Sequence, residues 1–215
     1  MNKKIIHNTQ YFVRNELGDD STGHDWHHIE RVRKYALYIA KKEERGDFFI
    51  IEMAALLHDI PDEKLNPSKG AGEEKLSDFL ATLEIHEEAK SKIKDIIYSI
   101  SFKGGLNNKV LSREAEIVQD ADRLDAIGAL GIARAFAYGG KKGQAIYDPV
   151  IEVRDEMTED EYRNGNSSSI NHFYEKLLRL KDKFNTVTAK EIAEERHKFM
   201  EQYLQQFYKE WNGQA

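Results

Sequence analysis

The amino-acid sequence predicts an all-α fold of about nine helices. Proline occurs three times in 215 residues, so few positions oppose helix formation. Glu, Lys, Leu and Ala, which favour helices, recur throughout, and no useful length of chain alternates apolar and polar residues as a half-buried strand does. The expected helices span roughly residues 3–17, 25–44, 47–59, 72–82, 86–101, 108–125, 127–138, 168–183 and 188–212.

Capping signals mark the ends of some of these helices. Asp25 is well placed as the N-cap of the helix that follows it. Thr188, with Glu191 three residues later, has the spacing of a capping box at the start of the last helix. Gly104 after Lys103 suits a helix C-terminus.

Length and composition fit one large globular domain over residues 1–215. Lys and Arg number 32 and Asp and Glu 38, and the net charge of −6 argues against binding to nucleic-acid duplexes or anionic membranes. The absence of cysteine excludes disulfides, cysteine nucleophiles and cysteine-ligated zinc. No signal peptide is recognisable, and no apolar stretch approaches the about 20 residues of a membrane span, so we expect a cytoplasmic protein.

Two features of the C-terminal part allow more than one interpretation. Residues 139–167, rich in glycine and serine, predict an irregular loop that is either a lid over a site or a surface excursion. The last helix carries an apolar stripe that we interpret as core, with a homodimer contact as the alternative. The stripe consists of Ile192, Phe199, Met200, Tyr203, Leu204, Phe207 and Trp211.

Three of the expected helices place a polar residue at one end of an apolar stripe. The stripes have helical spacing and consist of His28, Val32, Tyr35 and Ile39; of Phe48, Ile51, Ala55 and His58; and of Leu111, Ala115, Val118 and Asp122. We therefore expect His28, His58 and Asp122 to face the interior, with Asp59 beside them. A single histidine on an apolar face is usually a satisfied core residue, but three such stripes are much less common by chance.

Buried carboxylates at Asp59 and Asp122 need positive charge nearby, since an unpaired one costs several kcal/mol. One solution is a network of salt bridges to Arg31, Arg33 or Arg123. A divalent cation is the better solution because it binds both carboxylates and both imidazoles together. Two His and two Asp suit Mn²⁺, Fe²⁺, Ni²⁺, Co²⁺ or Zn²⁺, and imidazoles make Mg²⁺ less favoured.

At these residues the sequence resembles the HD-domain superfamily of metal-dependent phosphohydrolases. The matching segments are His28-Ile29-Glu30-Arg31-Val32, Ala54-Ala55-Leu56-Leu57-His58-Asp59 and Asp120-Ala121-Asp122-Arg123-Leu124-Asp125, in the order of the family. Further segments resemble the small bacterial YpgQ/YedJ-like branch, namely Ile100 to Gly104, Ala126 to Arg134 and His172 to Leu177. The core resemblance covers residues 24–135, and we expect the C-terminal helices at 168–212 to pack on that core.

The resemblance implies an HD-domain helical bundle that hydrolyses a phosphoester or phosphoanhydride. It assigns His28, His58, Asp59 and Asp122 as metal ligands. Two-metal members carry further histidines between the last two of these ligands, where this chain has only His86, so we expect one divalent ion. Mn²⁺ is favoured, with Fe²⁺, Ni²⁺, Co²⁺, Zn²⁺ and Mg²⁺ as alternatives. Close relatives are thought to act on nucleotides, and the YpgQ type is associated with nucleoside triphosphate pyrophosphohydrolysis.

The residues that would assist hydrolysis are sought beside the motifs. Asp62 and Glu63, directly after Pro61, are the candidates for the carboxylate that orients or deprotonates the attacking water, and a solvated turn is the alternative. A guanosine-tetraphosphate hydrolase branch of the superfamily has a similar acidic pair.

Phosphate groups need local cations in a chain of net negative charge. Lys103 is the first candidate for contact with the substrate, followed by Arg31 and Arg123. Each of these residues has an ordinary surface or ion-pairing role as the alternative.

Together these features predict a mononuclear metal phosphohydrolase acting on a nucleotide. A (d)NTP pyrophosphohydrolase, which cleaves between the α- and β-phosphates, is the best specific expectation. One alternative is a nucleoside monophosphatase. Another is a non-catalytic HD fold that holds a metal and a phosphorylated ligand as a sensor.

Overall fold

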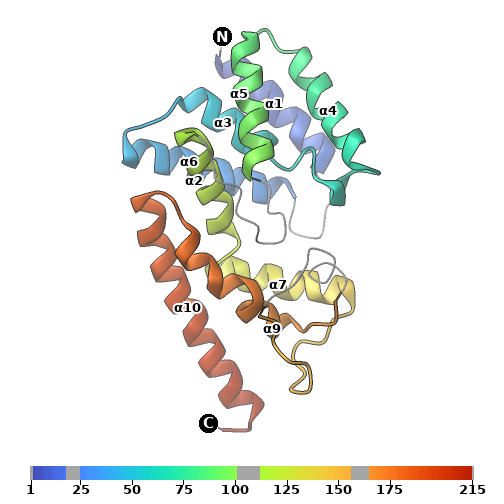
Figure 1. Cartoon of the computed structure of the whole chain (residues 1–215), viewed down its shortest axis with the longest axis vertical. Helices are drawn as coiled ribbons and strands as arrows, with labels where there is room; N and C mark the ends of the chain where they lie inside the picture. The colour runs from blue at the N-terminus through green and yellow to red at the C-terminus, as the bar shows by residue number, and fades with distance from the viewer. Residues whose placement is uncertain (1, 18–24, 101–111, 156–164, 215) are drawn as a thin grey trace. The chain divides into compact units, whose positions relative to one another are not determined.

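The computed structural model describes residues 2–17, 25–100, 112–155 and 165–214. All regular secondary structure in these ranges is helical, which confirms the all-α class (Figure 1). The elements are α1 (Asn2–Leu17), α2 (Trp26–Glu43), α3 (Phe48–Leu57), η1 (Glu63–Leu65), α4 (Lys69–Ala81), α5 (Glu87–Ile100), α6 (Arg113–Asp125), α7 (Gly128–Lys142), α9 (Ser169–His172), η2 (Phe173–Leu177), η3 (Leu178–Lys183) and α10 (Val187–Trp211). The chain divides into two compact units, Met1–Ala121 and Asp122–Ala215, so a single domain stays a prediction.

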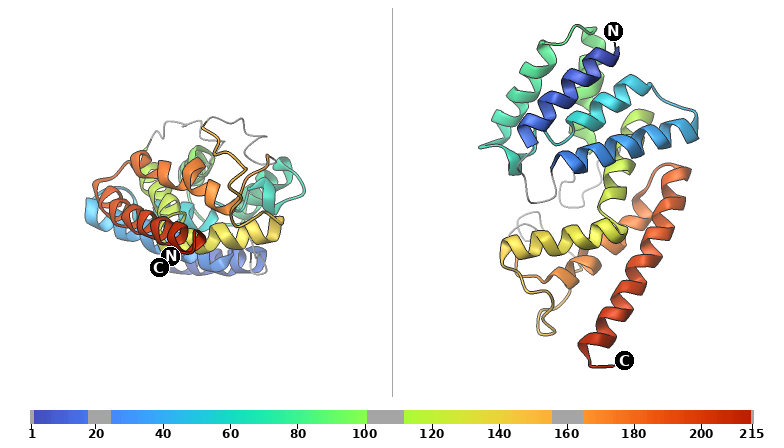
Figure 2. Two further views of the ribbon diagram at one scale, coloured as in Figure 1. Left: turned by 90° about the horizontal axis from the view of Figure 1, so that it is seen from below. Right: turned by 180° about the vertical axis from the view of Figure 1, so that it is seen from behind.

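Helix α3 is the central helix of the first unit because it is apolar on nearly every side. All its residues from Ile50 to Leu57 are buried except Glu52. Helices α1, α2 and α5 pack against it, as the front and back views show (Figures 1 and 2). The C-terminal end of such a helix lies in the interior, so the two residues that follow Leu57 are buried as well.

The ends of α2 and α3 follow from their caps. Asp25 is the N-cap of α2, as predicted, and its Oδ1 accepts a hydrogen bond from the backbone N–H of His28 at 2.8 Å. We expected the second of these helices to continue to residue 59, but it ends at Leu57. The chain then tightens into turns, since Pro61 has no N–H with which to extend the helix.

In the second unit, α7 and α10 pack on each other (Figure 2). The contact requires Gly128 at the start of α7, because φ is +76° and an added Cβ would lie 2.9 Å from Cγ of Arg196. Helix α7 continues through two glycines to Lys142, which corrects the expected irregular start at residue 139. Gly139 is needed there because an added Cβ would lie 2.2 Å from Oγ of Ser169.

The segment predicted as one helix over residues 168–183 is helical throughout but changes pitch. A four-residue α-helix leads into a π-helical turn, η2, and then into the 3₁₀-helix η3. Phe173, Glu175 and Leu177 in the π-helical turn are all buried, a spacing that one face of a regular α-helix does not provide.

The N-cap of the last helix lies two residues earlier than expected, and the helix itself begins at Val187. Its N-cap is Thr186, whose Oγ1 accepts from the backbone N–H of Ala189 at 3.2 Å, so the expectation of Thr188 was wrong. Both threonines offer the same hydroxyl, but Thr186 has the extended backbone of an N-cap, whereas Thr188 lies within α10. On the predicted stripe, Met200 and Leu204 are buried, whereas Phe199 and Trp211 are about half-exposed.

The described part of the predicted loop is fixed to the second unit. The ring of Tyr147 lies edge-on to the rings of Phe207, Tyr208 and Trp211 near the end of α10. The chain around Tyr147 also pairs with the start of α9 through backbone hydrogen bonds. These residues are therefore not a loose surface excursion, and a lid role for the loop stays a prediction.

Candidate metal centre

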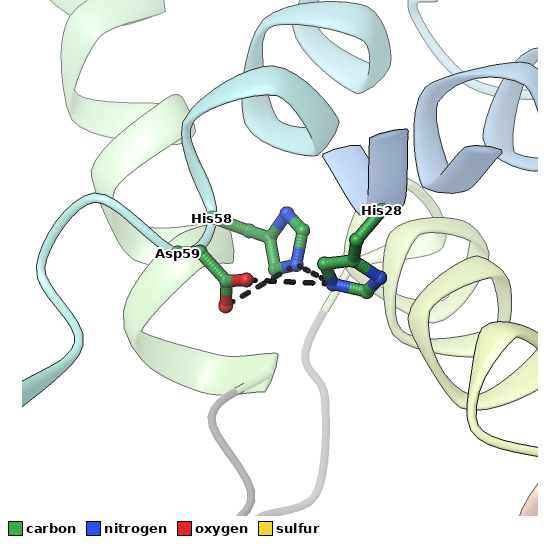
Figure 3. A group of neighbouring side chains, drawn as sticks. All are labelled: His28, His58 and Asp59. Atoms are coloured by element: carbon green, nitrogen blue, oxygen red, sulfur yellow. Dashed lines mark hydrogen bonds and ion pairs between the residues drawn. The ribbon is translucent and has the colours of Figure 1, made fainter. Parts of the chain in front are cut away.

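Three buried side chains converge on one point in the first unit. His28 comes from the first turns of α2, and His58 and Asp59 come from the C-terminal end of α3 (Figure 3). The Nε2 atoms of the two histidines are 3.3 Å apart. Oδ2 of Asp59 lies 3.4 Å from Nε2 of His28, and Oδ1 lies 3.4 Å from Nε2 of His58. The sequence prediction that these three residues face one interior site is consistent with this geometry.

The orientation of the His58 ring is set by the backbone of its own helix. Its Nδ1 is 2.8 Å from the carbonyl oxygen of Ala55, three residues earlier, which is one of the last carbonyls that the helix leaves unpaired. A carbonyl only accepts, so Nδ1 carries the proton and donates it to that oxygen. The neutral ring then has its lone pair on Nε2, toward His28 and Asp59, which is the tautomer that binds a metal.

The distances among the three side chains fit the coordination of one divalent ion. With metal–ligand bonds of about 2.1 Å, neighbouring ligand atoms lie about 3.0 Å apart at a right angle and about 3.4 Å apart at the tetrahedral angle. The separations of 3.3, 3.4 and 3.4 Å in this cluster fall in that range. Two imidazoles and one carboxylate suit Mn²⁺, Fe²⁺ or Zn²⁺ better than an all-oxygen ion such as Ca²⁺. The three residues thus form a site that could hold a metal.

Arg33, one of the arginines considered as a partner for the buried carboxylates, is engaged elsewhere. Its Nε donates to Glu30 at 3.0 Å, and its Nη1 donates to Glu52 on α3 at 3.1 Å. Burial raises the pKa of Glu52, and the Arg33 charge only partly opposes this effect. This network joins α2 to α3 and thereby supports the two helices that carry the site.

The other acidic residues predicted for the site lie at defined places in the chain. Asp62 is half-buried in the turn after Asp59, and the exposed Glu63 begins η1. Asp122, the expected fourth ligand, lies in the last turn of α6, at the residue with which the second unit begins. The roles of these three residues stay predictions.

The basic residues predicted to contact the substrate lie in different parts of the chain. Arg31 is half-buried on α2, three residues after His28. The guanidinium of Arg123 donates to the carbonyl oxygen of Lys183 within the second unit. Lys103 lies outside the described residues, as do Gly104 and Leu111. No described contact tests a role in substrate binding for any of these cations.

The end of α6, which carries Asp122, is anchored within the second unit by arginine side chains. Helix C-termini leave carbonyl oxygens without helical partners, and guanidinium groups satisfy them well. Arg134 donates to the carboxylate and to the backbone carbonyl of Asp125. Arg196 donates to the backbone carbonyl of Leu124. These contacts hold the last turn of α6 in a defined orientation relative to α7 and α10.

Two features of the site were not found in the sequence. The carbonyl of Ala55, which orients His58, is a backbone group, and the only signal for it was a histidine at the end of a helix. The side chain of Asn66 donates to two carbonyls in the turn after Asp59, and an asparagine in a loop gives no specific signal.

Comparisons with known proteins find relatives that match most of this chain. The HD domain family model matches residues 25–127, a range that contains all three converging side chains. The uncharacterized protein YpgQ of Bacillus subtilis (strain 168) is 45% identical over 204 residues, which cover 94% of this chain and 91% of that protein. An HD-superfamily hydrolase from Bacillus thuringiensis is 48% identical with a TM-score of 0.78, covering 100% of both chains. The crystal structure of Bacillus subtilis YpgQ in complex with ADP is 40% identical with a TM-score of 0.75, covering 95% of this chain and 97% of that one.

This chain therefore belongs to the HD domain family. Its enzyme class is that of the metal-dependent phosphohydrolases, as the resemblance of the motif segments implied. In the part of the chain that the structure describes, no helix is both long and apolar enough to cross a membrane.

Proposed function

We propose that this protein is a nucleotide phosphohydrolase, most specifically a (d)NTP pyrophosphohydrolase that uses one divalent ion, with Mn²⁺ favoured. The observation that carries the proposal is the convergence of the His28 and His58 Nε2 atoms and the Asp59 carboxylate within 3.4 Å of one another. The solved complex of YpgQ with ADP supports a nucleotide as the substrate. Asp122 is proposed as the fourth ligand on the strength of the motif alone.

The bound ion would lower the pKa of a water molecule and polarise the phosphorus centre. The residues of the chain supply the rest of the chemistry. Asp62 or Glu63, in the turn after Asp59, accepts the proton of the attacking water on a carboxylate oxygen. The water oxygen forms a bond to the α-phosphorus, and the bond from that phosphorus to the bridging oxygen breaks. The bridging oxygen leaves with the β-phosphorus, so the products are a nucleoside monophosphate and pyrophosphate.

Charge neutralisation is the second requirement of this reaction, since a triphosphate enters a chain of net charge −6. We assign this task to Arg31, which is one turn after His28 on α2, together with Lys103 and Arg123. Arg123 is the weakest of the three assignments because its guanidinium already serves the carbonyl of Lys183.

The test is a turnover assay with single nucleoside triphosphates, metal-stripped protein and added Mn²⁺, in which pyrophosphate and orthophosphate are resolved. His28→Ala should abolish pyrophosphate release. His27→Ala is the matched control, because His27 is the neighbouring residue on α2 but is exposed. Asp122→Asn should also abolish release and metal binding if Asp122 is the fourth ligand.

The products distinguish the proposal from its alternatives. Orthophosphate released from nucleoside monophosphates, without pyrophosphate from triphosphates, would indicate a monophosphatase. Metal binding without any product from either substrate would favour a sensor. Asp62→Asn and Glu63→Gln should both spare metal binding. The variant that removes the general base should hydrolyse the substrate about 10²- to 10⁴-fold more slowly. If neither variant loses rate, the assignment of the base is wrong.

A further inference from the structure

The side chain of Asn66 holds the turn that follows the His58-Asp59 pair. Its Nδ2 donates to the carbonyl oxygen of Ile60 at 2.8 Å and to the carbonyl oxygen of Asp62 at 2.8 Å. These two carbonyls flank Pro61, which has no N–H of its own to contribute. One amide nitrogen therefore joins Ile60, directly after Asp59, to Asp62, one of the two residues proposed as the general base.

The amide of Asn66 has only one orientation that this turn accepts. Reversing it would place Oδ1 against two carbonyl oxygens, so the nitrogen must face them. The buried Oδ1 has no hydrogen-bond donor among the described residues, which is unfavourable. The two hydrogen bonds made by Nδ2 offset this loss. An aspartate, although of the same shape, has no donor to replace them.

Helix α4 comes close to the carbonyl of Pro61, which lies between these two. An added Cβ at Gly72, in the first turns of α4, would lie 2.7 Å from the carbonyl oxygen of Pro61 and 2.9 Å from Nδ2 of Asn66. Helix α4 thus approaches the turn closely only because residue 72 is glycine. Asn66 thus binds the carbonyls of residues 60 and 62, and the backbone of Gly72 lies close to the carbonyl of Pro61 between them.

The held turn is connected directly to the metal centre. The backbone N–H of Asp62 donates to the carbonyl oxygen of Asp59 at 3.0 Å, and that of Ile60 donates to Leu57 at 3.1 Å. Asp59 therefore lies between a central helix on one side and the turn held by Asn66 on the other. Relaxation of the turn would move the Asp59 carboxylate relative to His28, which lies on α2, and to His58, whose ring is held by the carbonyl of Ala55.

We propose that Asn66 is a positioning residue of the metal centre, which acts through the turn and against Gly72 to hold Asp59 in place for metal binding. The inference rests on the proposed function for its metal site, but not on the identity of the substrate. Partners of metal ligands typically change metal affinity by about 10- to 100-fold when they are lost.

The test measures the Mn²⁺ dissociation constant of folded protein without substrate, at a temperature well below the unfolding of each variant. Asn66→Ala should weaken binding by about 10-fold or more. Asn66→Asp should also weaken it, although its added negative charge would by itself attract the cation. Gly72→Ala should weaken binding, whereas Gly70→Ala on the same helix should bind as the unaltered protein does, since its Cβ meets only Ser68 Oγ at 4.0 Å.

The outcomes separate positioning from mere structural support. If the Asn66 and Gly72 variants unfold at lower temperatures but bind Mn²⁺ with unchanged affinity, the proposal is overturned. Tighter binding by Asn66→Asp would overturn it too, because charge would then outweigh the loss of the two hydrogen bonds. Normal Mn²⁺ binding without hydrolysis by the unaltered protein would contradict the proposed function alone. Failure of the unaltered protein to bind Mn²⁺ would overturn both.

Discussion

Nδ1 of His58 lies 2.8 Å from the carbonyl oxygen of Ala55, and this contact directs the opposite nitrogen of the ring into the metal centre. The helix supplies the acceptor because its last carbonyls have no helical partner. One backbone oxygen therefore serves both the end of α3 and the orientation of a metal ligand.

This relationship predicts that neutral His58 has its proton on Nδ1. Long-range proton–nitrogen correlation spectra of the imidazole rings should show a protonated Nδ1 and an unprotonated Nε2. Zn²⁺, which is diamagnetic, should shift the Nε2 resonance and leave Nδ1 protonated. A spectrum with the proton on Nε2 in the metal-free protein would contradict the assigned orientation.

Metal binding should stabilise the folded protein through Asp59. At a free Mn²⁺ concentration of about 100 times the dissociation constant, the unaltered protein should gain about 2.7 kcal/mol in free energy of unfolding. Asp59→Asn should gain little, since it lacks the only negatively charged group among the three converging ligands, and His27→Ala should gain as much as the unaltered protein. Thermal unfolding with and without Mn²⁺ measures the difference, and an equal gain in Asp59→Asn would remove Asp59 from the ligand set.

Adjacent glycines in α7 should respond oppositely to the same substitution. An added Cβ at Gly139 would lie 2.2 Å from Oγ of Ser169, whereas one at Gly140 would meet nothing within 4 Å. Gly139→Ala should therefore lower the free energy of unfolding by about 1–3 kcal/mol. Gly140→Ala should raise it by up to about 1 kcal/mol because alanine favours the helix. Denaturant unfolding of the two variants tests the packing, and equal effects would show that α7 and Ser169 are not in close contact.

The buried ion pair of the second unit should make stability depend on pH. Burial would raise the pKa of Glu175, but hydrogen bonds from Arg154 and Ser167 outweigh it and hold the pKa below its usual value. The stabilisation is therefore full above the unfolded pKa of about 4.5 and is lost as pH falls through the lower folded pKa. Glu175→Gln should cost about 3 kcal/mol near neutral pH, because it leaves the Arg154 charge without its carboxylate.

The measurement is the difference in unfolding free energy between the unaltered protein and Glu175→Gln, followed from neutral to acidic pH. This difference should shrink as the pH falls, since protonated Glu175 and Gln resemble each other. A matched control is Glu88→Gln, which removes an exposed ion pair to Lys92 on α5 and should change stability little at any pH. A constant difference for Glu175→Gln across the pH range would contradict the linkage.

Much of the fold and part of the site could be predicted because they depend on local periodicity. The spacing of His28 and His58 with apolar residues identified the buried faces of two helices, and both side chains are buried. The N-cap at Asp25 was predicted correctly because its carboxylate accepts from the backbone N–H of His28, which lies within the same helical turn. The end of α3 was predicted two residues late because a His-Asp pair before Pro61 does not by itself show where the helical hydrogen bonds stop.

Contacts between distant parts of the chain lay beyond such reasoning. The spacing of Thr188 to Glu191 favoured Thr188 as the cap, but the extended backbone at Thr186 makes that residue the N-cap of α10. In η2, Glu175 is buried against Arg154, a contact between residues 21 positions apart that helical periodicity does not indicate.

By itself, the sequence determined the helical class and the residues that offer imidazole and carboxylate groups to an interior site. The periodicity of apolar residues indicates which face of a helix is buried, and this information was sufficient to predict both features. Only the tertiary structure decided that His28, His58 and Asp59 converge within 3.4 Å, that Ala55 orients the His58 ring and that Asn66 holds the turn after Asp59. These relationships depend on where backbone carbonyls and helix ends meet in space, and no local pattern of side chains encodes that.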